Sequence, residues 1–253
     1  MHVACSTQCF SRLSLQEALE TIAELEFHKL DLAIIEKSNH LRPSQVAENV
    51  AAVAAMIRSE HSLSPAAITL EIAADDPTEY LRQFTAVCQL ARLIRAPLVT
   101  IAAASSSSPV ETEVVRLTKL NQIAEKDGIT LSLATRQGTL TETPETAVEL
   151  CERVPGLVLT LDPSHYVANQ ASVKSYDQVY PYVRHVHLRD TGRGPNQFQV
   201  HVGQGEIEYS RVIAQLERCQ YNRLLTVDIH DQALECEKNP EVRKLKFLLE
   251  SLV

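Results

Sequence analysis

Short apolar segments recur along the chain at nearly even intervals, and longer stretches with a different hydrophobic pattern separate them. Eight of these short segments have the length and the apolar content of buried β-strands. The predicted strands are residues 3–6, 30–35, 68–72, 98–102, 129–134, 157–162, 184–188 and 224–229. Because they are spread over all 253 residues, there is room for a helix between one strand and the next.

The intervening stretches carry apolar residues three and four positions apart, which places these residues on one face of a helix. The predicted helices are residues 14–25, 44–57, 78–94, 110–124, 144–152, 209–216 and 240–252. Strands and helices that alternate in this way imply parallel strands joined by right-handed crossovers. The pattern therefore predicts a single α/β domain, residues 1–253, folded as a closed (β/α)8 TIM barrel. An open doubly wound sheet is disfavoured, because no glycine-rich loop follows the first strand.

Within several predicted strands, apolar and polar positions alternate. Residues 129–134 read Ile-Thr-Leu-Ser-Leu-Ala, and residues 157–162 read Leu-Val-Leu-Thr-Leu-Asp. In a barrel the apolar set faces the helices and the other set lines the interior. A half-solvated antiparallel sheet shows the same alternation, but it would leave the helical segments without a sheet face to cover. The inward residues near the carboxyl ends of strands, where barrel active sites are built, are then Glu71, Asp162, His185, His187 and Asp228.

Composition and charge narrow the class of protein. Hydrophobic residues make up 45% of the chain and charged residues 22%, as in ordinary soluble domains. The net charge of −8 and the absence of a basic patch disfavour nucleic acid as a partner. The sequence predicts no membrane-spanning segment and no signal peptide, and its six irregularly spaced cysteines are typical of reduced core thiols. The expected location is therefore the cytoplasm.

Three features carry candidate chemistry. Asp162 ends the sixth strand and His165 follows in the loop, a carboxylate–imidazole pair that suits Zn²⁺, Mn²⁺ or Co²⁺. Alternatively, Asp162 caps a turn and His165 lies on the surface. His185 and His187 share the inward face of the seventh strand. His187, at the mouth, is favoured as a metal ligand or substrate contact, and the deeper His185 as a buried residue satisfied by hydroxyl groups.

The third feature is the loop at residues 191–208, which holds four of the seven glycines. So many glycines indicate that the loop approaches something closely. Arg193 and His201 could contact an anionic or hydroxylated ligand there. A tight loop with exposed polar residues explains the composition equally well.

Four motifs together resemble a known family. They are Gly-Thr-Leu-Thr-Glu-Thr-Pro-Glu at 138–145, Leu-Asp-Pro-Ser-His at 161–165, His-Val-His-Leu-Arg-Asp at 185–190 and Val-Gly-Gln-Gly-Glu-Ile at 202–207. They look like the xylose isomerase-like barrels, the sugar phosphate isomerases and epimerases that are grouped with endonuclease IV. The resemblance implies one divalent metal ion held at the strand ends by Glu, Asp, His and Glu. In the epimerase members the two glutamates move a proton at the carbon beside a carbonyl.

Carried over by position, the resemblance makes Asp162 the metal aspartate and His187 the metal histidine. It makes His165 a substrate contact and places Arg193 where a substrate-binding arginine is expected. The two glutamates are different in this chain. The fifth-strand position is Ala134, which has no ligand atom, and the eighth-strand position is the shorter Asp228.

The implied metal set is therefore reduced to Asp162, His187 and Asp228, and one member of the acid/base pair is missing. Glu71 or His201 could supply a replacement. The endonuclease branch is a poor match, since Gln199-Val200-His201 stands where that branch has an Asp-x-His ligand pair, and an acidic chain suits DNA poorly.

The leading hypothesis is an isomerase or epimerase that acts on a small polyhydroxylated carbonyl compound with one divalent ion (Mn, Zn, Co or Mg). Asp228, Glu71 and His165 are the catalytic candidates, and His165, Arg193 and His201 the substrate-binding ones. The rival hypothesis, favoured by Ala134, is a catalytically silent sugar-binding or regulatory barrel. The expected partner is a small carbohydrate-like ligand, with no nucleic acid and no membrane, and an oligomer is compatible with the sequence.

Overall fold

Eight parallel strands close into a barrel, with each strand hydrogen-bonded to the next in sequence and the eighth to the first. The structure is a computed structural model that describes residues 1–59, 63–168, 173, 175–194, 197–230 and 238–253. The strands are β1 His2–Ser6, β2 Lys29–Ile35, β3 Ser64–Glu71, β4 Leu98–Ala102, β5 Thr130–Ala134, β6 Val158–Leu161, β7 Val183–Leu188 and β8 Leu224–Val227. The predicted (β/α)8 barrel and all eight predicted strands are confirmed.

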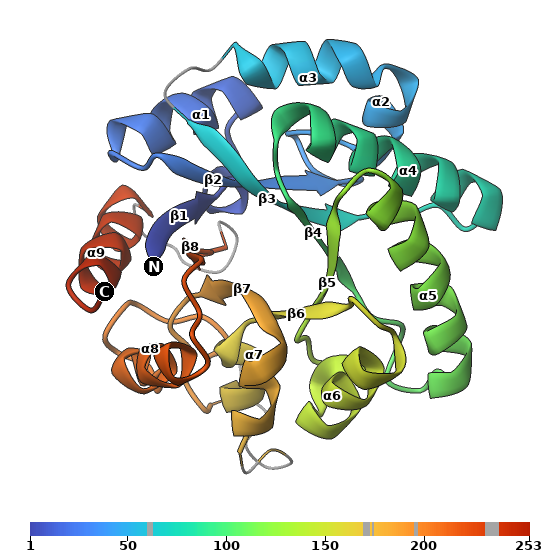
Figure 1. Ribbon diagram of the computed structural model, residues 1–253. Helices are drawn as coiled ribbons and strands as arrows, with labels where there is room; N and C mark the ends of the chain where they lie inside the picture. The colour runs from blue at the N-terminus through green and yellow to red at the C-terminus, as the bar shows by residue number, and fades with distance from the viewer. Residues whose placement is uncertain (60–62, 169–172, 174, 195–196, 231–237) are drawn as a thin grey trace.

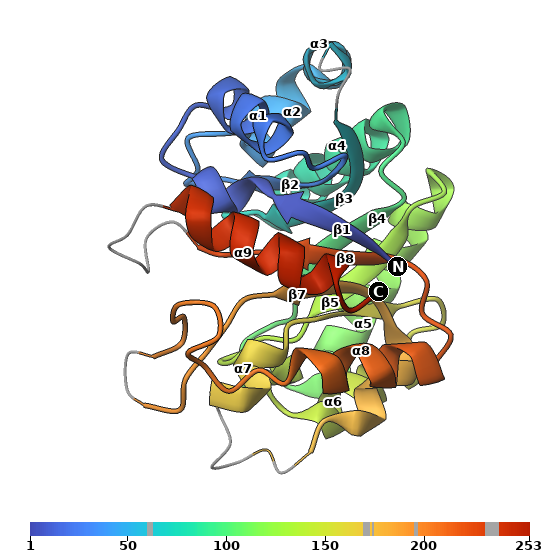
Figure 2. The same cartoon turned by 90° about the vertical axis from the view of Figure 1, so that its left-hand side faces the viewer.

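Helices form a layer around the barrel, and the two ends of the chain lie side by side (Figures 1 and 2). The α-helices are α1 Leu15–Glu24, α2 Pro43–Glu48, α3 Val50–Arg58, α4 Pro77–Ile94, α5 Val110–Lys126, α6 Pro144–Arg153, α7 Pro163–Ala168, α8 Tyr209–Arg218 and α9 Lys238–Glu250. The 3₁₀ helices are η1 Thr7–Phe10, η2 Leu140–Glu142 and η3 Asp177–Tyr182. Hydrophobic periodicity missed α7 and the 3₁₀ helices, because segments this short do not complete two helical turns.

The single helix predicted over 44–57 is divided in two at Asn49. The Asn49 side chain accepts the N–H of Ala52 at 3.0 Å and so begins α3 as an N-cap. Asparagine is among the preferred N-cap residues, because its side-chain oxygen satisfies an N–H that lacks a helical partner. The apolar pattern continues across the break, since both short helices bury the same face.

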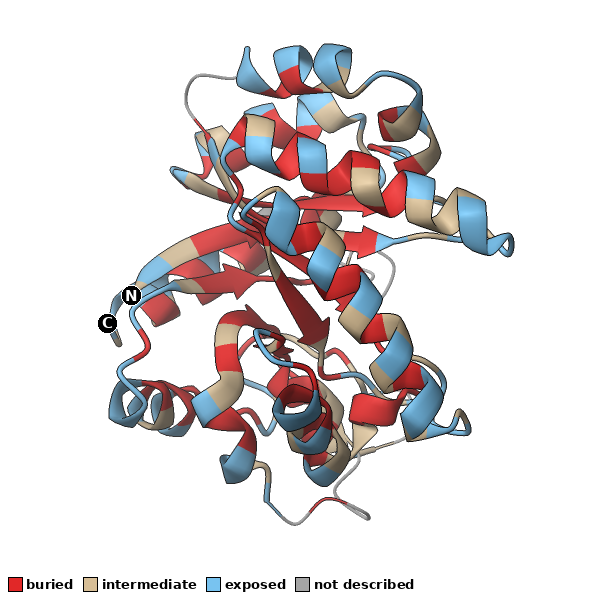
Figure 3. Ribbon diagram, turned by 45° about the vertical axis from the view of Figure 1, so that its right-hand side comes forward, coloured by how far each residue is buried: buried red, intermediate tan, exposed pale blue. Residues whose placement is uncertain are grey.

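Inward and outward positions follow the predicted alternation. Leu131 and Leu133 of β5 are fully buried members of the hydrophobic core. Buried residues follow the strands and the helix faces that pack on them (Figure 3). Inside the barrel, the hydroxyl of Thr160 lies 2.8 Å from that of Thr100 and 2.7 Å from that of Ser132. The interior is therefore polar and hydrogen-bonded, and the residues that continue this set beyond the strand ends meet at the mouth.

In the described part of the chain, no helix combines the length and the apolar character needed to cross a membrane. The predicted reduced thiols Cys5, Cys9, Cys88 and Cys151 are free and buried. Cys219 is also free but exposed, and Cys236 lies outside the described residues.

Candidate active site

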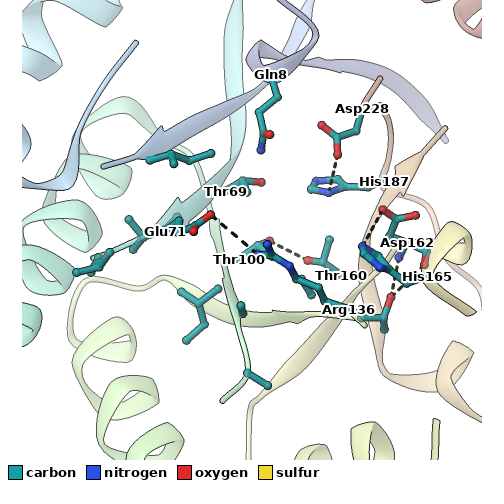
Figure 4. Close-up of a pocket in the computed structure, with 18 of the residues that line it drawn as sticks. Gln8, Thr69, Glu71, Thr100, Arg136, Thr160, Asp162, His165, His187 and Asp228 are labelled. Carbon is teal, nitrogen blue, oxygen red and sulfur yellow. Dashed lines mark hydrogen bonds and ion pairs between the residues drawn. The ribbon is translucent and has the colours of Figure 1, made fainter. Parts of the chain in front are cut away.

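The carboxyl ends of the strands enclose a cavity of about 480 Å³ (Figure 4). Among the residues singled out from sequence, those that line it are Glu71, Ala134, Asp162, His165, His187 and Asp228. Polar and aromatic lining residues that the sequence reasoning did not single out include Gln8, Tyr80, Arg136, Arg189, Phe198 and His230. Of the five inward residues predicted to converge, Glu71, Asp162, His187 and Asp228 line this cavity, whereas His185 does not.

A buried arginine occupies the centre of this group. Arg189, just beyond β7, donates from Nη2 to Asp162 Oδ2 at 2.6 Å and to Asp228 Oδ2 at 2.9 Å. All three residues are buried, with Arg189 only 3% exposed. Arginine is suited to this position because its guanidinium stays charged and offers several fixed N–H donors.

Short hydrogen bonds hold Asp162 in place. Its Oδ1 accepts the backbone N–H of Ser164 at 3.0 Å and also the Ser164 hydroxyl, at the start of α7. Its own backbone N–H donates to Thr135 Oγ1 at 2.8 Å. Burial acts to raise the pKa of Asp162, but the charge of Arg189 and the hydrogen bond from Ser164 outweigh burial, so the pKa lies below its ordinary value. Asp162 therefore both caps a turn and faces the cavity, which unites the two interpretations made from sequence.

Beneath the mouth, Asp31 of β2 joins the two histidines of β7. Asp31 Oδ2 accepts from His185 Nε2 at 2.8 Å and from His187 Nε2 at 2.7 Å, and Asp31 Oδ1 accepts the Thr69 hydroxyl at 3.0 Å. Thr226 Oγ1 lies 3.3 Å from His185 Nε2. The expected hydroxyl partner of His185 is present, but its main partner is a carboxylate that the sequence reasoning missed.

The two histidines of this cluster differ in charge. Burial lowers the pKa of His185 and keeps the ring neutral. Burial acts on His187 in the same direction, but the carboxylates of Asp228 and Asp31 outweigh it and raise the pKa of His187 to about 9. The second ring nitrogen of His187, Nδ1, lies 3.6 Å from Asp228 Oδ2. His187 is thus an imidazolium held between two carboxylates.

His165 faces the cavity as a neutral imidazole. Burial is the main cause that lowers its pKa to about 4. Its Nδ1 accepts the backbone N–H of Gln137 at 3.3 Å, so the ring proton resides on Nε2, which lies 3.7 Å from Asp162 Oδ2. The ring packs against Phe198, with 4.6 Å between the ring centroids. His165 can therefore donate a hydrogen bond to a ligand oxygen.

Glu71, at the end of β3, lies across the cavity from Asp162 and His165 (Figure 4). Its side chain is 57% exposed and lies 4.0 Å from Arg136. The second carboxylate on this cavity, Asp228, is ionised. Burial acts to raise the pKa of Asp228, but His230, His187 and Arg189 together lower it well below its ordinary value. Of the lining carboxylates described here, Glu71 is the one most open to solvent, because Asp162 and Asp228 are committed to Arg189.

Arg193 and His201 lie away from this group. Arg193 pairs with Glu206 at 3.1 Å on the surface, and His201 Nδ1 lies 3.5 Å from Glu241 Oε1. Neither is among the described residues that line the cavity. The structure therefore does not bring these two substrate-binding candidates to the other candidate residues.

The glycine-rich loop closes on Asp190 rather than on the cavity. The Asp190 carboxylate accepts the backbone N–H groups of Thr191 at 3.0 Å, Gly203 at 2.7 Å and Gly205 at 3.1 Å. A Cβ atom on Gly205 would lie 2.1 Å from Asp190 Oδ1, a distance that only glycine avoids. The close approach predicted from composition is real, and its object is a side chain of the protein.

The residues present do not fit a resident divalent ion at the position that the resemblance implies. Arg189 already supplies the cation between Asp162 and Asp228, and Ala134 offers no ligand atom. His187 directs Nε2 to Asp31 instead of to the two carboxylates. A metal ion could join the predicted ligands Asp162, His187 and Asp228 only after the Arg189 side chain had moved.

Asp31, His185 and His187 form a possible metal site in the described chain. Their candidate ligand atoms all lie within 4.8 Å of one another. In the structure these atoms are paired with each other, since one oxygen of Asp31 accepts from both imidazoles. Hydrogen bonding therefore accounts for the arrangement without an ion.

A family model described as xylose isomerase-like TIM barrel matches residues 19–250. No curated protein matches the chain. A D-tagatose 3-epimerase-like protein is similar in structure, with 17% identity, coverage of 100% of this chain and 98% of the other, and a TM-score of 0.76.

Two further solved structures have the same fold. The IOLI protein with a binding zinc atom has 16% identity, coverage of 100% of this chain and 98% of the other, and a TM-score of 0.76. The probable 3-DHS dehydratase AsbF, involved in petrobactin synthesis in Bacillus anthracis, has 15% identity, coverage of 99% of both chains and a TM-score of 0.76. At these identities the likeness establishes the fold alone.

Proposed function

The chain belongs to the xylose isomerase-like TIM barrel family, and on that premise we propose that it is an isomerase or epimerase of a small polyhydroxylated carbonyl compound. The observation that carries the proposal is the placement of Glu71 on one side of the cavity and of Asp162 and His165 on the other, where Arg189 is hydrogen-bonded to Asp162. Proton transfer beside a carbonyl needs a carboxylate at the carbon and hydrogen-bond donors at the oxygen. A cavity of about 480 Å³ suits a small ligand.

The solved relatives support a carbohydrate-like ligand. They include a D-tagatose 3-epimerase-like protein, a D-allulose 3-epimerase from Methylomonas and a 3-keto-D-glucoside 4-epimerase from E. coli. The reaction class shared by these epimerases changes the configuration of a single carbon of a sugar. The proposed ligand class for this chain is the same, an open or cyclic polyol that carries a carbonyl group.

The candidate residues divide the work by position and charge. Glu71 is the proposed base, because it is the most exposed of the carboxylates described at the cavity. His165 donates from Nε2 to a substrate oxygen, since its Nδ1 lone pair is engaged by Gln137. Asp228 binds a substrate hydroxyl through Oδ1, which has no hydrogen-bond partner in the described part of the chain. The divalent ion that the resemblance implies is assigned no step in this proposal.

The rival function is a sugar-binding or regulatory barrel without turnover. The observation that favours it is the end of β5, where the family glutamate is replaced by Ala134. The backbone carbonyl of Ala134 accepts the Thr141 hydroxyl at 2.7 Å, so this carbonyl is already engaged within the protein. A binding barrel would keep the donors of the cavity and need no base.

Hydrogen exchange in D₂O distinguishes the two functions. A panel of ketoses and inosose-type ketones is incubated with the protein, and proton NMR follows the hydrogens on the carbons beside the carbonyl. We expect one class of compound to exchange, and Glu71→Gln to slow exchange at least about 10²-fold through loss of the base. Glu149→Gln is the matched control, because Glu149 is a similarly exposed glutamate paired with Arg153 outside the described cavity lining. Saturable binding of a panel compound with no exchange would favour the silent barrel.

A further inference from the structure

Three buried polar atoms at the mouth have no hydrogen-bond partner among the described residues. They are Arg189 Nε, Arg189 Nη1 and Asp228 Oδ1. Arg189 is 3% exposed and Asp228 is 2% exposed, and both residues line the same cavity. Buried polar groups are normally hydrogen-bonded, and unpaired ones reduce stability. Two donor groups and one acceptor side by side therefore indicate a missing oxygen-rich ligand.

The charge of Arg189 occupies the place of a metal ion. Its Nη2 lies 2.6 Å from Asp162 Oδ2 and 2.9 Å from Asp228 Oδ2, which are two of the carboxylates that the resemblance assigns to a divalent ion. A guanidinium anchored in this way on one nitrogen directs its other N–H groups elsewhere. Nε and Nη1 are the nitrogens left for a ligand.

We propose that the Arg189 guanidinium replaces the divalent ion of the family as the electrophile of this site, and that it binds the α-hydroxycarbonyl edge of the substrate. Arg189 Nη1 donates to the carbonyl oxygen, and Asp228 Oδ1 accepts the proton of the neighbouring hydroxyl. Arg189 Nε, whose N–H points to another side of the guanidinium, donates to a further oxygen of the ligand. The binding step follows from these three atoms alone, whereas the catalytic step rests on the proposed isomerase or epimerase function.

In the catalytic step, Glu71 removes the proton from the carbon beside the carbonyl. The electrons of that C–H bond form a carbon–carbon double bond, and the carbonyl π electrons move to the oxygen. Arg189 stabilises the negative charge that develops there, as preorganised donors do in oxyanion sites. Glu71 then returns the proton to the neighbouring carbon, whose hydroxyl becomes the new carbonyl as its proton passes through Asp228 Oδ1 to the first oxygen. This isomerisation needs no oxidant or other reactant.

Phe198 shields this electrophile from water. The ring centroid of Phe198 lies 5.3 Å from Arg189 Cζ, and the same ring packs on His165. In a dry environment a charged donor interacts more strongly with a developing oxyanion than it does in water. A ligand that reaches Nε or Nη1 must displace neighbouring side chains, because both atoms are inaccessible in the structure.

The deeper cluster of Asp31, His185 and His187 does not offer an equivalent electrophile. Asp31 and His185 are not among the described residues that line the cavity. An ion at that cluster would therefore lie below the substrate oxygens, with Arg189 still paired to both carboxylates above it.

A metal titration of the protein tests whether Arg189 takes the place of the divalent ion, and it needs no measurement of turnover. Chelator-treated protein receives Co²⁺, Mn²⁺ or Zn²⁺ alone, and calorimetry and the visible absorption of Co²⁺ report binding. We expect that the parent protein binds no ion through Asp162, so the titration curves of the parent and of Asp162→Asn should be the same. One ion bound by the parent and lost in Asp162→Asn or Asp228→Asn would overturn the proposal.

Arginine variants supply the second arm. In Arg189→Ala the two carboxylates lose their cation, and we expect Co²⁺ to bind at least tenfold more tightly than to the parent. Arg136→Ala is the matched control, because it removes a guanidinium from the mouth without freeing either carboxylate. If Arg189→Ala does not fold, the comparison of the parent with Asp162→Asn still shows whether a divalent ion binds at the two carboxylates.

Turnover separates failure of this proposal from failure of the proposed function. If a substrate is found, its conversion should be unchanged by a chelator and lost in Arg189→Lys, which keeps a charge but not the planar set of donors. Conversion that needs an added divalent ion would overturn the role of Arg189 while leaving the isomerase or epimerase function intact. If the protein converts no compound and also binds no ion that depends on Asp162, Arg189 remains the cation of this site. In that case only the catalytic step is overturned.

Discussion

At the scale of single residues, the charges at the mouth balance each other within a few ångströms. Asp162 and Asp228 share Arg189, while Asp31 and Asp228 flank His187. A buried pair of this kind contributes little net stability, but removal of one partner leaves a buried charge unmatched. Each member is therefore far more sensitive to substitution than an ion pair on the surface.

Substitution of Arg189 by methionine should destabilise the fold strongly. Arg189→Met leaves the carboxylates of Asp162 and Asp228 buried without their cation, and we expect a loss of about 3–5 kcal/mol in the free energy of unfolding. Urea denaturation followed by circular dichroism measures it. Arg153→Met, which breaks an exposed pair with Glu111 and Glu149, should destabilise the fold far less, because solvent screens exposed charges. Equal losses in the two variants would contradict the buried-charge account.

The pH dependence of stability should carry a signature of His187. Because the pKa of His187 is raised to about 9 in the folded state, its contribution is fully present below the unfolded value of about 6.5. The contribution is lost as pH rises through about 9. We therefore expect the free energy of unfolding to fall between these limits, and His187→Gln to flatten the curve there. A parent and variant with parallel curves over this range would show that His187 is not charged in the fold.

At the scale of elements, one side chain organises the long loop after β7. Asp190 accepts three backbone N–H groups at 3.1 Å or less, from Thr191, Gly203 and Gly205. Because the same loop carries Phe198, this anchor also determines where the aromatic cover of Arg189 lies. The loop is thereby linked to the chemistry of the mouth, although Arg193 and His201 point to partners outside it.

A methyl group at Gly205 should disturb this anchor. In Gly205→Ala the new Cβ would lie 2.1 Å from Asp190 Oδ1 and 2.5 Å from the Thr191 carbonyl oxygen, so the loop must shift. We expect a loss of about 1–3 kcal/mol in stability, the usual cost of overpacking. Gly194→Ala is the control, since its nearest atom is the flexible end of Gln197. Differential scanning calorimetry compares them, and equal melting temperatures for both variants would contradict a tight anchor at Asp190.

At the scale of the whole molecule, the barrel gathers residues from distant parts of an acidic chain into one mouth. The net charge is −8, and the buried cations Arg189 and His187 are matched by carboxylates. Such a balance favours a small neutral ligand over a polyanion, because phosphate backbones are bound through unpaired lysine and arginine side chains.

Double-stranded DNA should therefore not bind. A fluorescently labelled duplex with an abasic site, titrated with the protein at about 150 mM salt, should show no change in anisotropy up to about 10 μM, because an acidic surface lacks the electrostatic attraction that supplies non-specific affinity. Saturable binding with a steep dependence on salt would instead support the endonuclease branch of the family.

The sequence by itself determined the barrel, since eight strands with period-two alternation and the helices between them leave few other arrangements. The same alternation placed Asp162, His187 and Asp228 at the mouth, and it also marks Asp31 and Arg189, which share the inward parity of their strands. What it could not supply is which of these side chains pair with which. Asp31, Asp162, Arg189 and Asp228 come from β2 and from the ends of β6, β7 and β8, and only closure of the barrel sets the distances between them. Electrostatic interactions depend on those distances and on burial, so the tertiary structure alone decided that an arginine lies where the family resemblance placed a metal ion.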